Sequence, residues 1–172
     1  MNEALKAKIR DIPDFPQKGI LFKDITPLLN DATAFRQAVE SLGTHYQSTP
    51  IDVVVSIEAR GFILGAALAY YLQAGLVPIR KAGKLPYRTH KATYELEYGT
   101  DVMEMHLDAL QPGQHVLLVD DVLATGGTML AATDLVKQAQ ANIIGIAVLI
   151  ELSFLKGRER LKGYDVFSLL RY

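Results

Sequence analysis

The sequence predicts an α/β fold, a single parallel β-sheet of Rossmann-like type with right-handed crossovers. Three aliphatic runs, at 52–57, 116–119 and 143–150, have the pattern of strands buried on both faces of a sheet. The first two runs each lead through a short turn into a helical pattern, over 62–69 and 129–140. Strands that alternate with helices in this way indicate a parallel sheet.

Length and composition favour one domain over residues 1–172. The chain has 172 residues, of which 49% are hydrophobic, and a net charge of -1, a balance that argues against nucleic-acid and membrane-surface partners. No apolar run is long enough for a transmembrane helix, and the charged first ten residues do not resemble a signal peptide. With no cysteine and no signal, a cytoplasmic protein is expected.

The first fifty residues predict two helices and a packed loop. Residues 3–12 have Leu5, Ile9 and Ile12 on one side of a short helix. The stretch 19–29 is apolar and bracketed by prolines, which favours a packed loop over a central strand. Asn30 or Asp31 can then cap a helix that runs through 34–42.

The rest of the chain adds strands and an arm. Residues 76–81 form a third short strand, and 164–170 close the sheet after a charged turn or short helix at 156–161. Between them, 92–97 and 102–107 alternate in polarity, which predicts a β-hairpin. The segment from about 82 to 106 is therefore expected to be a flexible β-arm that acts as a lid.

The stretch 116–128 carries the strongest functional signal. Asp120 and Asp121 follow its aliphatic run, and a turn of small and hydroxyl residues leads into a helix. Glycine amides and threonine hydroxyls at a helix N-terminus can bind a phosphate, while the two carboxylates suit sugar hydroxyls or a hydrated divalent cation. The alternative is that the acids only cap a helix and the glycines make an ordinary turn. The residues expected to form the phosphate cup are Ala124, Thr125, Gly126, Gly127 and Thr128.

Three cations follow neighbouring strands. Arg60 lies near a predicted helix N-terminus, where a positive charge is unfavourable unless an anion is present, and Arg80 and Lys84 follow the third strand. The alternatives are a surface arginine paired with a carboxylate and a solvated basic strand end. Together with the phosphate cup and the acid pair, these cations suit phosphoribosyl pyrophosphate. The four histidines show no metal-ligand spacing and do not compete with this interpretation.

The 116–128 stretch resembles the signature of the type I phosphoribosyltransferases, and further motifs narrow the resemblance to the adenine phosphoribosyltransferase family. These motifs are Asp14-Phe15-Pro16, 19–27, Arg60-Gly61-Phe62, Arg80-Lys81, 83–86, 96–99, Glu151-Leu152 and 155–158. The resemblance implies transfer of phosphoribose from phosphoribosyl pyrophosphate to adenine, which gives AMP and pyrophosphate in purine salvage, with Mg²⁺. It also implies a small hood at about 1–30, a homodimer, and a non-proline cis peptide at Glu58-Ala59.

The resemblance also assigns the base site. It places adenine between Phe22 and Leu152, with backbone groups of Leu21 and Lys23 reading the edge of the base. Lys23 stands where many family members have arginine, which matters little if only its backbone is used. Glu97 in the arm is implied as the general acid/base at a purine ring nitrogen, and Tyr98 as a neighbour that seals the site.

The remaining roles follow the motifs. The resemblance assigns residues 124–128 to the 5-phosphate, and Arg60, Arg80 and Lys84 to pyrophosphate, with the alternative that one of these three cations acts across the interface of the dimer. Asp120 and Asp121 take the ribose hydroxyls, directly or through Mg²⁺-bound water, so no direct metal ligand is expected. Two alternatives remain: a phosphoribosyltransferase for hypoxanthine, guanine or xanthine, and a non-catalytic regulator that senses phosphoribosyl pyrophosphate.

Overall fold

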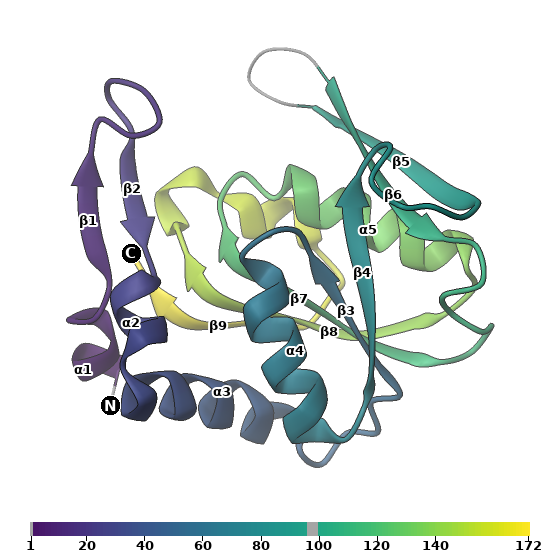
Figure 1. The fold of residues 1–172 in the computed structure, drawn as a ribbon, viewed down its shortest axis with the longest axis horizontal. Helices are drawn as coiled ribbons and strands as arrows, with labels where there is room; N and C mark the ends of the chain where they lie inside the picture. Colours follow the sequence, from purple (N-terminus) through teal and green to yellow (C-terminus); the bar gives the residue numbers. More distant parts are fainter. Residues whose placement is uncertain (1, 96–99) are drawn as a thin grey trace.

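The core is a seven-stranded sheet with helices on both faces. The computed structural model describes residues 2–95 and 100–172, and the strand order of the sheet is β5-β6-β4-β3-β7-β8-β9 (Figure 1). The five strands from β4 to β9 are mutually parallel, as the sequence predicts. They are β3 (Val53–Ile57), β4 (Gly75–Lys81), β7 (His115–Leu123), β8 (Asn142–Glu151) and β9 (Val166–Arg171).

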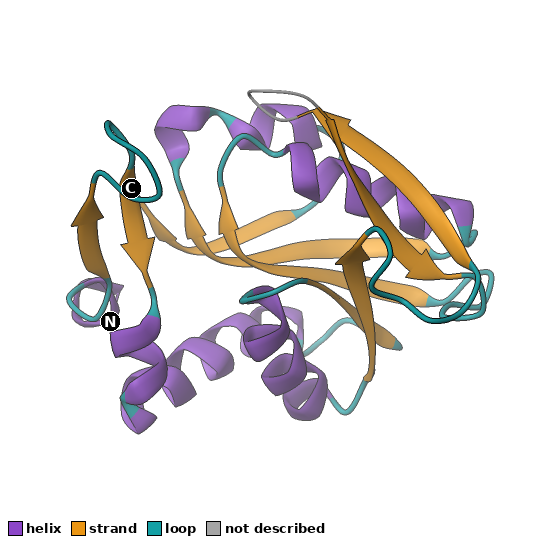
Figure 2. Ribbon diagram, turned by 45° about the horizontal axis from the view of Figure 1, so that its top comes forward, coloured by secondary structure: helices purple, strands orange, loops and turns teal. Residues whose placement is uncertain are grey.

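The sheet separates two apolar layers, each of which is covered by helices. Figure 2 shows α3 (Ala32–Tyr46) and α4 (Gly61–Leu72) on one side of the sheet and α5 (Gly127–Gln138) on the other. Every residue of β3 is buried, as expected for a strand that is covered on both faces. The Asp31 carboxylate accepts hydrogen bonds from the amides of Thr33 and Ala34, which confirms the predicted cap of α3.

The predicted arm is a hairpin of β5 (Thr89–Glu95) and β6 (Thr100–His106). β6 pairs antiparallel with the end of β4, where Arg80 lies opposite Glu104, so the arm extends the edge of the sheet. The Glu104 carboxylate is buried and accepts a hydrogen bond from the amide of Gly83. The base of the arm is therefore fixed to the end of β4, from which the pyrophosphate cations are expected.

The N-terminal segment departs from two predictions. The first helix, α1 (Asn2–Lys6), is shorter than expected, and Ile12 lies in a strand, β1 (Arg10–Pro13). Part of the expected loop at 19–29 is also structured, as β2 (Leu21–Asp24) and α2 (Thr26–Asn30). β1 and β2 pair antiparallel as a separate two-stranded sheet. Their pairing is supported by a 2.6 Å ion pair between Arg10 and Asp24, a contact across two strands that the periodicity of either segment alone could not reveal.

The end of β7 also differs from the prediction. The strand does not stop before the acid pair but continues to Leu123, and Asp120 lies opposite Val148 of β8. The chain after β8 forms two short 3-10 helices, η1 (Ser153–Leu155) and η2 (Gly157–Leu161), in agreement with the expected turn or short helix. The peptide bond Glu58-Ala59 is cis, as the family resemblance implies. Among the described residues, no helix is both long and apolar enough to span a membrane.

Candidate active site

The candidate site lies where the chain leaves β3, β7 and β8. The carboxyl ends of parallel strands are the usual ligand-binding edge of an open α/β sheet. In Figure 1, the β1–β2 hairpin and the β5–β6 arm stand on either side of the turns that follow β7 and β8. The fold therefore gathers the turns that carry the acid pair and the phosphate cup between two projecting hairpins.

The turn expected to form the phosphate cup lies at the N-terminus of α5 and lines a pocket. A small pocket of about 70 Å³ is lined by Asp120, Met129 and residues of the turn between them. Gly126 has a φ of 83°, a left-handed conformation that glycine adopts without steric cost, and Gly127 begins the helix. The positive end of the helix dipole and the first helical amides face this pocket, so it suits a phosphate monoester.

A second glycine, Gly157 in η2, supports the cup from behind. A Cβ on Gly157 would overlap the carbonyl oxygen of Ala124 and lie 2.9 Å from the amide nitrogen of Gly126. A Cβ on Gly126 would lie 2.5 Å from the carbonyl oxygen of Gly157. The two backbones touch, so the cup is held by a segment about thirty residues further along the chain. This role of Gly157 could not be predicted from sequence, because a lone glycine in a charged turn gives no signal of a distant contact.

The acid pair links the cup to a second pocket. Asp120 lines the cup, whereas Asp121 lines the neighbouring pocket and lies 2.6 Å from Nε of Arg60. Burial, together with the charge of Asp121, raises the pKa of Asp120 well above its ordinary value. Burial also raises the pKa of Asp121, although Arg60 opposes the shift. Two carboxylates held in this way favour a cation or hydroxyl donors between the two pockets.

The second pocket contains all four residues expected to bind the base. Its volume is about 300 Å³, and Leu21, Phe22 and Lys23 of β2 face Leu152 across it. Arg60 closes one side, with its guanidinium carbon 4.6 Å from the centroid of the Phe22 ring. An apolar pocket with an aromatic wall and a few polar groups is suited to a flat heterocycle. Ile20 and Val122 also line this pocket, although neither was predicted from sequence to bind the base.

The walls of this base pocket are tied together by contacts outside it. The side chain of Lys23 makes a 2.6 Å ion pair with Asp11 and lies 4.0 Å from the centroid of the Tyr172 ring. The amide of Ser153 donates to the carbonyl oxygen of Tyr172, and the amide of Leu152 donates to that of Leu123. Since the Lys23 side chain is engaged elsewhere, its backbone is the part available to a base.

An ion pair between buried Glu151 and half-buried Arg158 anchors the chain on both sides of η1. Arg158 donates to both carboxylate oxygens of Glu151, at 2.9 and 2.6 Å, and also to the hydroxyl of Ser168. Arg158 lowers the pKa of Glu151 and outweighs the opposite effect of burial. Because Glu151 precedes Leu152 and Arg158 follows Gly157, this pair positions one wall of the base pocket and the support of the phosphate cup.

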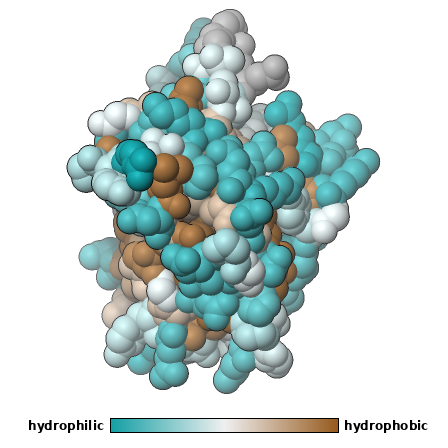
Figure 3. Space-filling view, turned by 90° about the vertical axis from the view of Figure 1, so that its right-hand side faces the viewer, coloured by the Kyte–Doolittle hydropathy of each residue, from teal (hydrophilic) through white to brown (hydrophobic). Residues whose placement is uncertain are grey.

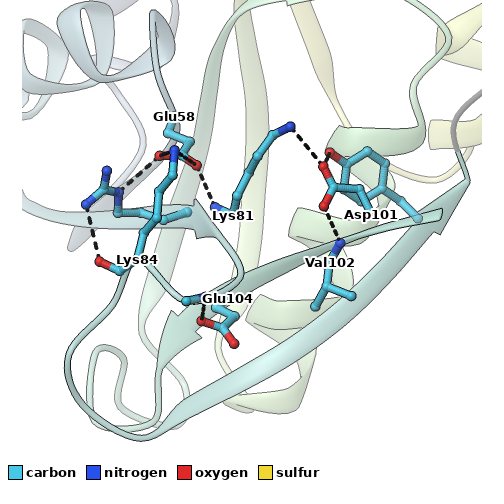
Figure 4. Close-up of polar contacts among 9 residues, drawn as sticks. Glu58, Lys81, Lys84, Asp101, Val102 and Glu104 are labelled. Atoms are coloured by element: carbon cyan, nitrogen blue, oxygen red, sulfur yellow. Dashed lines mark hydrogen bonds and ion pairs between the residues drawn. The ribbon is translucent and has the colours of Figure 1, made fainter.

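The cations expected to bind pyrophosphate separate into two places. Arg80 and Lys84 lie together on the carboxylate of Glu58, each with a closest nitrogen-oxygen distance of 3.1 Å (Figure 4). Arg60 is instead paired with Asp121 at the base pocket. Asp121 therefore supplies a negative charge next to Arg60 at the start of α4. This contact corresponds to the alternative considered from sequence, an arginine paired with a carboxylate. Glu58 was not identified from sequence, although it directly follows β3.

The remaining predictions concern the acid/base candidates of the arm, metal ligands and the histidines. Glu97 and Tyr98 lie outside the described residues. Among the residues that the structure does describe, no group of three or more histidine, aspartate and glutamate side chains could hold a metal ion. His45 stacks on Phe167 with ring centroids 4.0 Å apart, and His115 lies 3.3 Å from Asp52. Both contacts agree with structural roles for these histidines.

Comparison with known proteins gives consistent matches over the whole chain. Residues 29–170 match the family model of the phosphoribosyl transferase domain. The adenine phosphoribosyltransferase of Halothermothrix orenii is 58% identical over 167 residues, which are 97% of this chain and 98% of that protein. The crystal structure of adenine phosphoribosyltransferase from Thermoanaerobacter pseudethanolicus has a TM-score of 0.98 at 51% identity and covers 100% of both chains.

A third match is a complex with ligands. The Saccharomyces cerevisiae adenine phosphoribosyltransferase, complexed with an imino-altritol bisphosphate and adenine, has a TM-score of 0.95 at 42% identity. The alignment covers 98% of each chain.

Proposed function

This chain belongs to the adenine phosphoribosyltransferase family and has the type I phosphoribosyltransferase fold, and from that premise we propose how its residues divide the work. The enzyme converts adenine and phosphoribosyl pyrophosphate into AMP and pyrophosphate, a step of purine salvage. The observation that carries the assignment of residues is the adjacency of two pockets, one apolar and aromatic, the other a phosphate cup, with Asp120 and Asp121 between them.

The sugar phosphate occupies the cup and the acid pair. The amides at the start of α5 and the hydroxyls of Thr125 and Thr128 bind the 5-phosphate. Asp120 and Asp121 accept hydrogen bonds from the ribose hydroxyls, directly or through cation-bound water. In this arrangement the anomeric carbon lies toward the base pocket, because Asp120 lines the cup and the adjacent Asp121 lines the base pocket.

Adenine binds in the pocket between Phe22 and Leu152. Stacking on the Phe22 ring supplies affinity without distinguishing one purine from another. Selection comes from the backbone groups of Leu21 and Lys23, since the Lys23 side chain is held by Asp11 and Tyr172. A backbone edge can pair with the amino group and ring nitrogen of adenine but not equally with a 6-oxopurine.

The residues present fit a Mg²⁺ ion that is held largely through water and substrate. Phosphoribosyltransferases in general use Mg²⁺ with phosphoribosyl pyrophosphate. The acid pair offers two carboxylates whose charged forms are disfavoured by burial, and a cation beside them would stabilise those charged forms. Mg²⁺ commonly binds through one or two carboxylates, waters and substrate phosphates. When bound, the ion would neutralise charge that develops on the departing diphosphate.

Pyrophosphate leaves toward the cations at the end of β4. Arg80 and Lys84 bind the departing group together with Arg60, which also closes one side of the base pocket. Glu97 in the arm holds or accepts the proton at a purine ring nitrogen, and Tyr98 helps exclude water that would hydrolyse the sugar. The lid function of the arm belongs to this proposal, as does the N-terminal hood formed by the β1–β2 hairpin.

A cytoplasmic homodimer is the proposed working form. Apolar side chains reach the surface on α4 and β4, where Ile63, Tyr70 and Leu76 are exposed by 44%, 90% and 45%. Figure 3, which shows the side of the molecule at the right of Figure 1, has brown areas within a largely hydrophilic surface. Exposed apolar area of this kind is typical of subunit interfaces. Sedimentation of the purified protein tests the assembly state.

An assay of pyrophosphate release with Mg²⁺ tests the assignment of the substrate. Adenine is expected to support turnover, and guanine, hypoxanthine and xanthine run beside it are expected to give little. Preferential turnover of a 6-oxopurine would refute the base assignment. If none of the four bases supported pyrophosphate release, the result would instead favour a non-catalytic sensing role.

The role of Glu97 has a separate test. Replacing it with glutamine should lower turnover by about 10²–10⁴-fold, the usual contribution of a general acid/base, with little change in the affinity for phosphoribosyl pyrophosphate. Turnover close to that of the wild type would remove Glu97 from proton transfer.

A further inference from the structure

We propose that Glu58 is an internal counter-anion of the pyrophosphate site: its carboxylate positions Arg80 and Lys84 and, by its charge, weakens the binding of pyrophosphate so that this product can leave. The inference rests on the proposed function, which assigns Arg80 and Lys84 to pyrophosphate. It adds a residue that no step of the reaction assigned above requires.

The contacts of Glu58 show that one carboxylate organises the whole cation cluster. Its Oε2 accepts a hydrogen bond from Nε of Arg80 at 3.1 Å, and its Oε1 accepts one from the backbone amide of Lys81 at 2.7 Å. Nζ of Lys84 lies 3.1 Å from Oε1 and 3.3 Å from Oε2. Figure 4 shows these donors converging on Glu58 from the end of β4 and the turn that follows it.

Burial places the carboxylate behind the cations. The side chain of Glu58 is 6% exposed, whereas those of Arg80 and Lys84 are 36% and 50% exposed. An anion that arrives from solvent therefore meets the cations first, with the negative charge of Glu58 behind them. Burial alone would raise the pKa of Glu58, but its bonds to Lys81, Lys84 and Arg80 outweigh this and keep the pKa below its ordinary value. The group is thus ionised at neutral pH.

Lys81 is a third cation at the end of β4, but its side chain does not offset the charge of Glu58. Nζ of Lys81 lies 2.9 Å from Asp101 of β6, so this side chain is neutralised by the arm. Two cations and one carboxylate remain at the end of β4, and the net charge offered to a highly charged diphosphate is reduced by one unit. Because Glu58 bonds the same nitrogens that would hold a phosphate, it also competes for donors. Arg80 is further fixed by a 3.3 Å hydrogen bond to the carbonyl oxygen of Lys84.

A functional consequence follows from these charges. A cluster made of cations alone would bind pyrophosphate, the most highly charged product, most tightly and would release it slowly. A permanent internal anion fixes the cations in place before substrate arrives and limits their affinity afterwards. Glu58 is therefore a positioning residue that acts through Arg80 and Lys84.

The test measures pyrophosphate binding directly. Calorimetric titration of the full-length protein with pyrophosphate and Mg²⁺ should give about tenfold tighter binding for Glu58→Gln than for the wild type, since a unit charge a few ångströms away is removed while an acceptor for the Lys81 amide remains. The KM for phosphoribosyl pyrophosphate should fall in the same direction, and the KM for adenine should not change. The gain should shrink as salt is raised.

Two further variants make the result decisive. Asp52→Asn changes the net charge by the same amount at the opposite end of β3, where Asp52 accepts a hydrogen bond from the amide of His115, and should leave pyrophosphate binding unchanged. Glu58→Asp keeps the charge but withdraws it by one methylene, so its affinity for pyrophosphate should lie between those of the wild type and Glu58→Gln. This variant also tests the proposal if Glu58→Gln does not fold. Unchanged or weaker pyrophosphate binding in both Glu58 variants would overturn the proposal. Lack of adenine-dependent turnover in the wild type would instead refute the proposed function.

Discussion

Replacement of Gly157 by alanine should damage the phosphate cup from behind without touching any substrate. The added Cβ would overlap the carbonyl oxygen of Ala124 and lie 2.9 Å from the nitrogen of Gly126. Both neighbours are backbone atoms, so relief requires η2 and the cup to separate by about 0.5–1 Å. Such overpacking usually costs about 1–3 kcal/mol of folding free energy. A displacement of about 1 Å in a binding element can cost about 10²-fold in catalysis.

The assay separates the cup from the base pocket. Pyrophosphate release at saturating adenine should show a large rise in the KM for phosphoribosyl pyrophosphate, while the KM for adenine changes less, because Gly126 and Gly157 do not line the base pocket. The base pocket does share Val122 and Ala124 with the cup, so a small change in the KM for adenine is expected. Urea unfolding measures the loss of stability.

Gly75→Ala is a matched control. A Cβ on Gly75, at the start of β4, would lie 3.6 Å from the carbonyl oxygen of Asp52, an ordinary contact. This variant should keep wild-type kinetics and gain up to about 1 kcal/mol in stability, since alanine restricts the unfolded chain. If Gly157→Ala kept the wild-type KM for phosphoribosyl pyrophosphate, the reasoning about backbone contact behind the cup would be wrong.

Two predictions concern carboxyl groups whose pKa values are shifted in opposite directions, Asp120 and Glu151. Burial and the charge of Asp121 raise the pKa of Asp120, so the stability linked to its proton is lost as pH rises through the folded-state value. Asp120→Asn should therefore stabilise the ligand-free protein at neutral pH by about 1 kcal/mol while weakening the binding of phosphoribosyl pyrophosphate; thermal unfolding with no gain would contradict this. Arg158 lowers the pKa of Glu151, so the stability from ionised Glu151 is present above the unfolded value of 4.5 and is lost as pH falls through the lower folded value. Glu151→Gln should cost about 2 kcal/mol at pH 7, and urea unfolding should show its difference from the wild type shrinking below pH 4.5; a constant difference would rule out this linkage.

The sequence gives strong signals where local pattern and tertiary role coincide. The aliphatic run of β7, the acid pair and the glycine turn lie within thirteen consecutive residues, so strand, cup and helix could be predicted together. The cap at Asp31 and the arm are likewise local, since each depends on neighbours in the chain or on a single hairpin. Leu21, Phe22, Lys23 and Leu152 were assigned to one pocket through the resemblance, and the structure brings them together.

Contacts between distant segments were decided by the tertiary structure. Residues 10–12 were predicted as the end of the first helix but lie in a strand, because pairing of Ile12 with Phe22 satisfies the backbone of both segments. The sequence does not distinguish the roles of Arg60, Arg80 and Lys84. In the structure, Arg60 pairs with Asp121 at the base pocket, whereas Arg80 and Lys84 pair with Glu58.

What the sequence determined by itself is the set of chemical groups and the strand-turn-helix units that carry them, because hydrophobic periodicity and turn residues act over a few positions. What only the tertiary structure decided is which groups meet: Glu58 with its cations, Gly157 behind the cup, and Tyr172 beside Lys23. These contacts depend on sheet order and on the close approach of backbones far apart in the chain, and no local pattern encodes them.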